Sequence, residues 1–173
     1  MIDNYMETYM GIHFYPLHLT IDSINIKDIA HALSNICRFN GHSSEFFSVA
    51  QHSILVSDHV SMKNKMWALL HDASEAYICD IPSPLKKSDY FKEYRNIEKN
   101  IMDVICDKFG MDHKEPEEVK KYDLLALRTE AEQLGFNVKE WCIYDLKPLD
   151  VTIKCWSADK TEEVFLNTFY ELY

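Results

Sequence analysis

The sequence predicts an all-α protein in which about six helices form one bundle around a single core. Apolar residues recur three and four positions apart in several long stretches, as they do on the buried face of a helix. Glycine and proline are scarce, with 4 and 5 copies in 173 residues, and they stand between these stretches. We interpret residues 1–173 as one domain, because the length suits a single domain and the 47% hydrophobic content is enough for a core.

The helical stretches follow an irregular beginning. Residues 1–22 are rich in aromatic residues, and we interpret them as an extended arm or short hairpin packed on the body. Asp22 or Ser23 would cap the first helix, and Gly110 directly follows the fourth, as glycine does at a left-handed helix end. Residues 136–156 are β-prone and are predicted to form a short irregular or β-hairpin segment before the last helix. The predicted helices span residues 24–37, 48–60, 63–77, 89–109, 116–134 and 157–173.

Charge and cysteine content argue against several classes of function. A formal net charge of -10 disfavours broad, nonspecific binding to a nucleic acid polymer. No apolar run approaches the roughly 18 residues of a membrane span, and residues 1–20 lack the pattern of a signal peptide. The five cysteines include no C-x-x-C pair, which is typical of reduced thiols in the cytoplasm. The sequence therefore predicts a cytoplasmic protein that acts on small molecules and not on nucleic acid or membrane.

Residues 67–87, WALLHDASEAYICDIPSPLKK, carry most of the candidate chemistry. An apolar run leads directly into His71, Asp72 and Glu75, and the last of these lies one helical turn from the first two. Buried charges are costly unless they are paired or bind a metal, so this polar end of a core helix needs partners. The pattern favours a divalent-metal site with a spare carboxylate.

Three of the predicted helices together offer a full set of ligands. The candidate metal ligands are His52, His71, Asp72 and Asp123. Imidazole and carboxylate groups suit a divalent ion such as Zn, Co, Mn, Fe or Mg. On an octahedral ion, this set would leave two positions for water and a phosphate oxygen, and an open position is what separates a catalytic site from a structural one.

These residues resemble a known signature. Their order along the chain is similar to the H…HD…D pattern of the HD-domain metal-dependent phosphohydrolases. The stretch ALLHDASEAYICDIPSPLK resembles the bacterial HD-domain 5′-deoxynucleotidases, and DIAHALSNICRFNGH followed by SVAQHS resembles short phage-type members that include dATP triphosphohydrolases. The resemblance covers roughly residues 24–134. It implies an HD-domain helical bundle, a metal-dependent hydrolase of deoxynucleotides, and a homo-oligomer, either a dimer or a hexamer.

The resemblance also implies roles for residues around the metal. It implies that the four candidate ligands hold the ion, and that Glu75 acts on the attacking water or on the leaving group. Asp80, held by the proline turn, would assist Glu75. Arg38 would grip a phosphate with two parallel hydrogen bonds. Phe39 beside it would stack on a base or sugar.

The form of the substrate has two alternatives. Lys86 and Lys87 follow the proline turn and would hold β- and γ-phosphates, which favours dATP, hydrolysed to deoxyadenosine and triphosphate; the alternative for these lysines is simple solvation. Phe39 stands where the dedicated nucleotidases carry Trp, which weakens the other choice, a 5′-deoxynucleotidase that releases phosphate from a dNMP. A third hypothesis is that the protein is a non-catalytic, metal-stabilised module that binds nucleotides. Glu75 argues against it, because a structural site gains nothing from this carboxylate.

Overall fold

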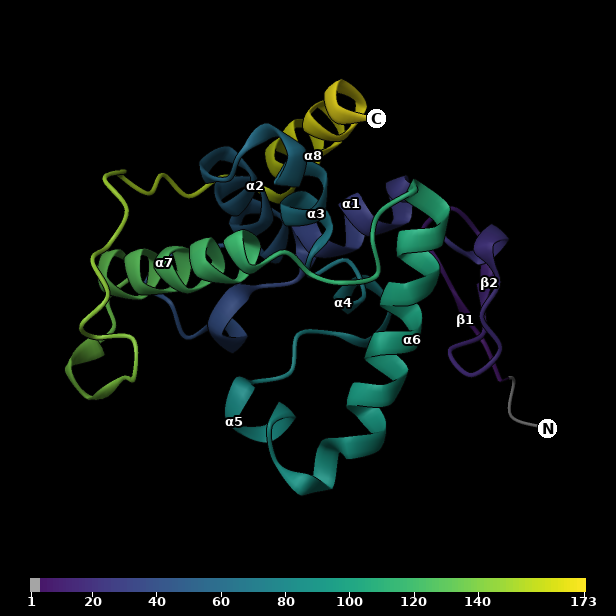
Figure 1. Ribbon diagram of the computed structural model, residues 1–173, viewed down its shortest axis with the longest axis horizontal. Helices are drawn as coiled ribbons and strands as arrows, with labels where there is room; N and C mark the ends of the chain where they lie inside the picture. The colour runs from purple at the N-terminus through teal and green to yellow at the C-terminus, as the bar shows by residue number, and fades with distance from the viewer. Residues whose placement is uncertain (1–3) are drawn as a thin grey trace.

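The computed structural model of the chain describes residues 4–173 and confirms an all-α bundle with a short hairpin (Figure 1). The helices are α1 (Ile26–Asn35), α2 (Val49–His59), α3 (Lys65–Leu70), α4 (Glu75–Ile78), α5 (Ser83–Lys86), α6 (Lys92–Phe109), α7 (Glu117–Gln133) and α8 (Ala158–Leu172). The strands are β1 (Met6–Glu7) and β2 (His13–Phe14). Within the described residues, no helix is both long and apolar enough to cross a membrane.

The N-terminal arm forms the short hairpin that was one of its two predicted forms. Strands β1 and β2 pair antiparallel, with Met6 opposite Phe14. The Phe14 side chain is fully buried and stacks on Tyr77 of α4, with the ring centroids 4.2 Å apart. The backbone N–H of Met10 donates to Asp28 Oδ1 in α1 at 2.7 Å. The arm is therefore fixed to two helices of the bundle, while residues 1–3 of the predicted arm lie outside the described residues.

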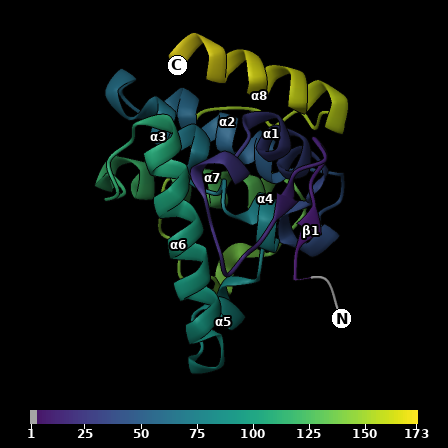
Figure 2. The ribbon, with the colours of Figure 1, turned by 90° about the vertical axis from the view of Figure 1, so that its right-hand side faces the viewer.

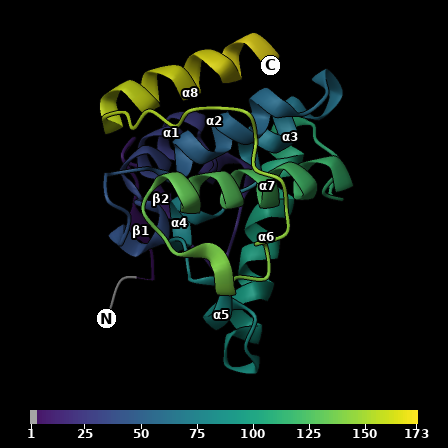
Figure 3. The same cartoon turned by 90° about the vertical axis from the view of Figure 1, so that its left-hand side faces the viewer.

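Helices α1, α2 and α3 pack together beneath α8, which lies across one end of the molecule (Figures 2 and 3). Helix α8 begins where the sequence predicts, and Ser157 caps it by accepting from the backbone N–H of Lys160 at 3.3 Å. Three buried residues, Thr161, Phe165 and Phe169, recur every four positions along α8. This spacing places them on one face, which closes the core over α1 and α2.

The predicted helix over residues 63–77 is wrong in one respect, because it is interrupted. Helix α3 ends at Leu70, a turn follows, and α4 begins at Glu75. The ring nitrogen Nδ1 of His71 donates to the carbonyl of Ala68 at 2.7 Å. That carbonyl would otherwise accept the backbone N–H of Asp72 in a continuous helix, so the side chain competes with the helical pattern. The interruption places His71 and Asp72 in a turn, where both side chains reach the same point.

The predicted cap of the first helix is also wrong. Asp22 and Ser23 belong to a separate single turn, Ile21–Ser23. Asn25 caps α1, and its side chain accepts from the backbone N–H of Lys27 at 2.9 Å. Because several capping-type residues precede this helix, the sequence does not specify where the helix begins. The separate turn at Ile21–Ser23 moves the first residue of the helix to Ile26.

The segment before α8 takes the irregular form and not the hairpin form. It contains a one-turn 3₁₀ helix, Val138–Glu140, and a further turn at residues 142–145, and then runs extended over residues 151–156 towards α8 (Figure 3). Two glutamine side chains, each donating one hydrogen bond and accepting another, hold this extended backbone. The bonds join Gln133 of α7 to Val151 and Ile153, both at 2.8 Å, and Gln51 of α2 to Lys154 at 2.6 Å and Trp156 at 3.1 Å.

Cys79, which ends α4, has a backbone conformation (φ 67°, ψ 159°) that is nearly exclusive to glycine. Such strain costs roughly 1–3 kcal/mol, whereas glycine adds roughly 0.5–1 kcal/mol of unfolded-state entropy. Because the Cys79 side chain is exposed, its loss removes little packing. We expect Cys79→Gly to raise the free energy of unfolding by about 1 kcal/mol in urea denaturation. Cys142→Gly, at another exposed cysteine without positive φ, is the control and should lower stability slightly. If the Cys79→Gly protein is less stable than the wild type, the backbone at Cys79 is not strained.

Candidate metal centre

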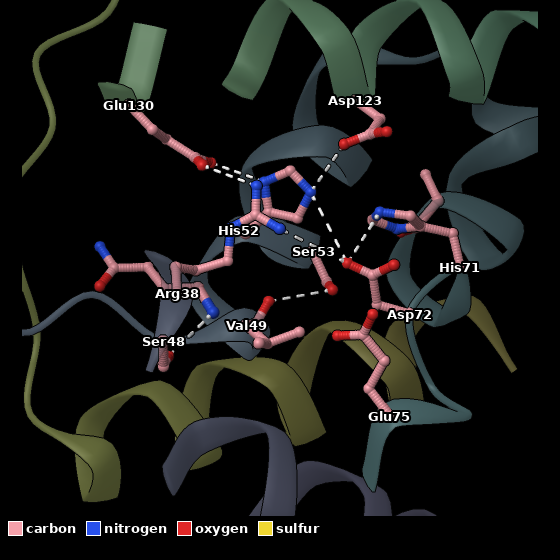
Figure 4. Close-up of polar contacts among 12 residues, drawn as sticks. Arg38, Ser48, Val49, His52, Ser53, His71, Asp72, Glu75, Asp123 and Glu130 are labelled. Carbon is pink, nitrogen blue, oxygen red and sulfur yellow. Dashed lines mark hydrogen bonds and ion pairs between the residues drawn. The ribbon is translucent and has the colours of Figure 1, made fainter. Parts of the chain in front are cut away.

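The predicted ligands converge on one point in the core (Figure 4). His52 is fully buried in the first turn of α2. Its Nε2 lies 3.1 Å from Asp123 Oδ1 of α7 and 3.8 Å from Asp72 Oδ2. His71 Nε2 lies 3.3 Å from the same Asp72 oxygen. Ligand atoms of His52, His71 and Asp72 all lie within 4.8 Å of one another, so these three residues can hold a metal ion, with Asp123 beside them.

The hydrogen bonds of the two histidines leave the right atoms free for a cation. His52 Nδ1 lies 2.6 Å from Glu130 Oε1, and His71 Nδ1 lies 2.7 Å from the Ala68 carbonyl oxygen. A carboxylate and a carbonyl only accept, so each Nδ1 donates and each neutral ring keeps its lone pair on Nε2. Both Nε2 atoms are buried and make no hydrogen bond. Buried nitrogen lone pairs that face carboxylates fit a divalent cation.

The electrostatics of the centre favour positive charge. Burial opposes protonation of His71, but the carboxylates of Asp72 and Asp123 and the Ala68 carbonyl together outweigh burial and raise the pKa of His71 to about 10. For Asp72, burial favours the neutral acid, yet the charges of His71, His52 and Arg38 outweigh it and hold the pKa of Asp72 below its usual range. The pKa of Asp123 is lowered for similar reasons, since its contact with His52 and the charge of His71 together outweigh burial. The same carboxylates that stabilise a proton here would stabilise a metal ion.

Arg38 lies beside the candidate metal ligands, as the sequence predicts for a phosphate-binding residue. It stands in the turn Arg38–Gly41 after α1, and its side chain is 12% exposed. One terminal nitrogen donates to Glu130 Oε2 at 3.1 Å, and the other lies 3.9 Å from Asp72 Oδ2. Its Nε is buried without an acceptor. The guanidinium is therefore fixed in place and still has a donor to offer to an anion.

Glu130 is the residue of the centre that sequence reasoning missed. Its side chain is fully buried, and its two oxygens contact His52 and Arg38 (Figure 4). Burial would raise the pKa of Glu130, but the charges of His52 and Arg38 outweigh burial and lower it. One signal was available in the sequence. Glu130 lies two helical turns after Asp123, so both carboxylates occupy one face of α7.

Glu75 lies on the other side of Asp72, at the start of α4, and is 4% exposed. Its Oε1 accepts from Lys86 Nζ at 3.1 Å, whereas Oε2 is buried without a partner. Burial, followed by the negative charges of Asp72 and Asp80, raises the pKa of Glu75 well above its ordinary value, although Lys86 opposes this. A carboxylate with one unpaired oxygen and a raised pKa is suited to accepting a proton.

The remaining predicted site residues surround this centre. Lys86 Nζ is held between Glu75 and Glu98, with the Glu98 oxygen 2.7 Å away, and Lys87 is exposed. Asp80 is half-buried just after α4. Phe39 packs in an aromatic group with Phe136 and Trp141, at centroid distances of 4.7 and 6.4 Å. The substrate contacts of Phe39 and of both lysines stay predictions.

Comparison with known proteins gives relatives whose names state no activity. No family model matches the chain. It is 45% identical over 134 residues to the uncharacterized protein YfdR of Escherichia coli K12, covering 78% of this chain and 74% of YfdR. It is 33% identical over 131 residues to an uncharacterized protein of Rhodobacter capsulatus, covering 68% of this chain and 66% of that protein. By the extent of the first match, the chain belongs to the same family as YfdR.

Proposed function

We propose that the protein is a divalent-metal-dependent phosphohydrolase of deoxynucleotides. The observation that carries the proposal is the convergence of two buried, unpaired imidazole nitrogens and the Asp72 carboxylate between Arg38 and Glu75 (Figure 4). Asp123 would complete the ligand set, which suits Zn, Co, Mn or Mg. When bound, the cation supplies Lewis acidity that polarises a phosphoryl oxygen and makes water a stronger acid.

Arg38 binds the phosphate in this proposal. Its guanidinium is held by Glu130, and its buried Nε has no acceptor within the protein. A buried donor without a partner costs roughly 1–3 kcal/mol, so an anion that satisfies it is favoured there. A phosphate with one oxygen at Arg38 and another at the candidate ligands would lie between these residues.

Glu75 takes the proton of the attacking water. Hydrolysis forms a bond between the water oxygen and phosphorus and breaks the bond from phosphorus to the 5′-oxygen of the sugar. The proton leaves the water for the unpaired Oε2 of Glu75, and Glu75 then gives that proton to the departing 5′-oxygen, so the carboxylate is regenerated. Asp80 assists by its negative charge, which raises the pKa of Glu75 and so makes this carboxylate a better base.

One observation bears on the form of the substrate. Two carboxylates already engage Lys86, and Lys87 points to solvent, so Arg38 is the cation beside the described ligands that is placed for phosphate. A single phosphate needs no more, which favours the 5′-deoxynucleotidase reaction on a dNMP. The dATP triphosphohydrolase reaction remains the second candidate, and it requires Lys86 to exchange a carboxylate for a β- or γ-phosphate.

Incubation of the protein with dAMP or dATP, with Co²⁺ or Mg²⁺ and with EDTA, tests the proposal. We expect deoxyadenosine to form only with the metal, together with phosphate from dAMP or triphosphate from dATP, separated by chromatography. Phosphate from dAMP and no product from dATP selects the nucleotidase, and triphosphate from dATP selects the second candidate. Metal-dependent binding of both nucleotides without any product would contradict the proposal and favour a non-catalytic nucleotide-binding module.

A further inference from the structure

Glu130 has two partners with different tasks. Its Oε1 lies 2.6 Å from His52 Nδ1, and its Oε2 accepts from a terminal nitrogen of Arg38 at 3.1 Å. All three side chains are buried or nearly so, with exposed fractions of 0% for Glu130 and His52 and 12% for Arg38. Water therefore has little access to replace either contact. One carboxylate thus connects a predicted metal ligand to the predicted phosphate-binding residue.

We propose that Glu130 is a positioning residue that fixes the metal-binding tautomer of His52 and the orientation of Arg38 together. This inference rests on the proposed function for the metal at His52 and for the phosphate at Arg38. Because the carboxylate only accepts, the proton of a neutral His52 stays on Nδ1 and the lone pair stays on Nε2, which faces Asp72 and Asp123. Because the second oxygen of Glu130 holds Arg38, the guanidinium stays at a fixed distance from His52.

Glutamine at position 130 cannot perform both tasks. Its side chain has one acceptor oxygen and one donor NH₂ group, whereas His52 Nδ1–H and Arg38 both need an acceptor. If the NH₂ group faces His52, the ring must carry its proton on Nε2, where it blocks a metal ligand. If the NH₂ group faces Arg38, the guanidinium loses its partner and turns away. Either orientation disturbs the centre without changing its size.

Calorimetric titration with Co²⁺, which needs no turnover, tests the first task. We expect Glu130→Gln to weaken Co²⁺ binding about 10- to 100-fold, the usual range for loss of such an outer partner. Glu132→Gln is the matched control, because Glu132 lies on the same helix and also pairs with an arginine, Arg128, but is exposed. Its Co²⁺ affinity should equal that of the wild type. Wild-type affinity for Co²⁺ together with wild-type affinity for dAMP, in a folded Glu130→Gln protein, would overturn the proposal, because glutamine can serve at most one of the two tasks.

A double variant keeps the test valid if the Glu130→Gln protein does not fold. Glu130→Gln alone leaves Arg38 buried without its carboxylate, whereas Arg38→Gln with Glu130→Gln removes both charges together. We expect the double variant to bind Co²⁺ about 10- to 100-fold more weakly than Arg38→Gln alone. Equal affinities in these two proteins would overturn the first task. Glu130→Asp keeps an acceptor-only group, so its affinity should lie nearer to the wild type than that of Glu130→Gln, and the reverse order would favour simple packing.

Binding of dAMP to the Co²⁺-loaded proteins tests the second task. Glu130→Gln should weaken dAMP binding in the wild-type background but not in the Arg38→Gln background, because its effect passes through the guanidinium. An equal loss in both backgrounds would overturn the role of Arg38. Failure to hydrolyse any deoxynucleotide would count against the proposed function alone, since the Co²⁺ titration is independent of turnover.

Discussion

Replacing Glu75 by glutamine is expected to lower kcat about 10²- to 10⁴-fold while the protein still binds its metal. Glutamine has the same shape and can still accept from Lys86 through its amide oxygen, but it cannot take a proton from water. The ligand atoms of the centre belong to other residues, so the Co²⁺ affinity should change little. Turnover of the preferred deoxynucleotide and calorimetric Co²⁺ titration of the same preparation measure the two quantities.

The comparison variant is Glu98→Gln. Glu98 is the other carboxylate that holds Lys86, at 2.7 Å, so this change weakens the lysine contact and leaves Glu75 intact. A partly exposed ion pair contributes roughly 1 kcal/mol or less. We therefore expect kcat to fall at most a few-fold. Equal losses in the two variants would show that Lys86, and not proton transfer to Glu75, accounts for the effect.

Truncation of Phe165 to alanine is expected to lower the free energy of unfolding by about 3–5 kcal/mol. Phe165 is fully buried at the centre of the face by which α8 closes the core. The change removes the ring and leaves a cavity that the neighbouring helices cannot fully close. For a domain of this size, each kcal/mol corresponds to about 2–4 °C in Tm. Urea denaturation and thermal scans followed by circular dichroism both measure the loss.

Asn167→Ala serves as the reference on the same helix. Asn167 is exposed, so its replacement should change stability by no more than about 0.5 kcal/mol. A small effect of Phe165→Ala, similar to that of the reference, would mean that α8 is not part of the cooperative core. Co²⁺ binding at the candidate metal centre provides a second measurement, because α8 also packs on α2, which carries His52.

The long helices and the convergence of the candidate ligands were predictable from sequence because each has a local signature. Helices α6 and α8 repeat apolar residues at helical spacing, and the HD pair with its flanking residues marks the centre. The interruption at His71 was not predictable, because it depends on a side chain that competes for one backbone carbonyl. Glu130 was missed because its contacts with His52 and Arg38 form only once α7 is packed against α2 and the turn after α1.

The partners of Lys86 were also not predictable from the sequence. A lysine two residues after a Pro-x-Pro turn looks available for phosphate, and nothing nearby in sequence names a competitor. In the folded chain, Glu98 from α6 and Glu75 from α4 both reach Lys86. Charge balance between separate helices is a property of the tertiary structure, so the sequence leaves it open.

The extended residues 151–156 alternate between half-buried and exposed side chains up to Cys155, as a β-strand does. Successive residues of such a backbone point their N–H and C=O groups to opposite edges. Gln133 bonds to residues 151 and 153 and Gln51 to residues 154 and 156, so the two side chains occupy opposite edges. Each glutamine thereby occupies backbone groups on an edge that another chain would need for intermolecular strand addition.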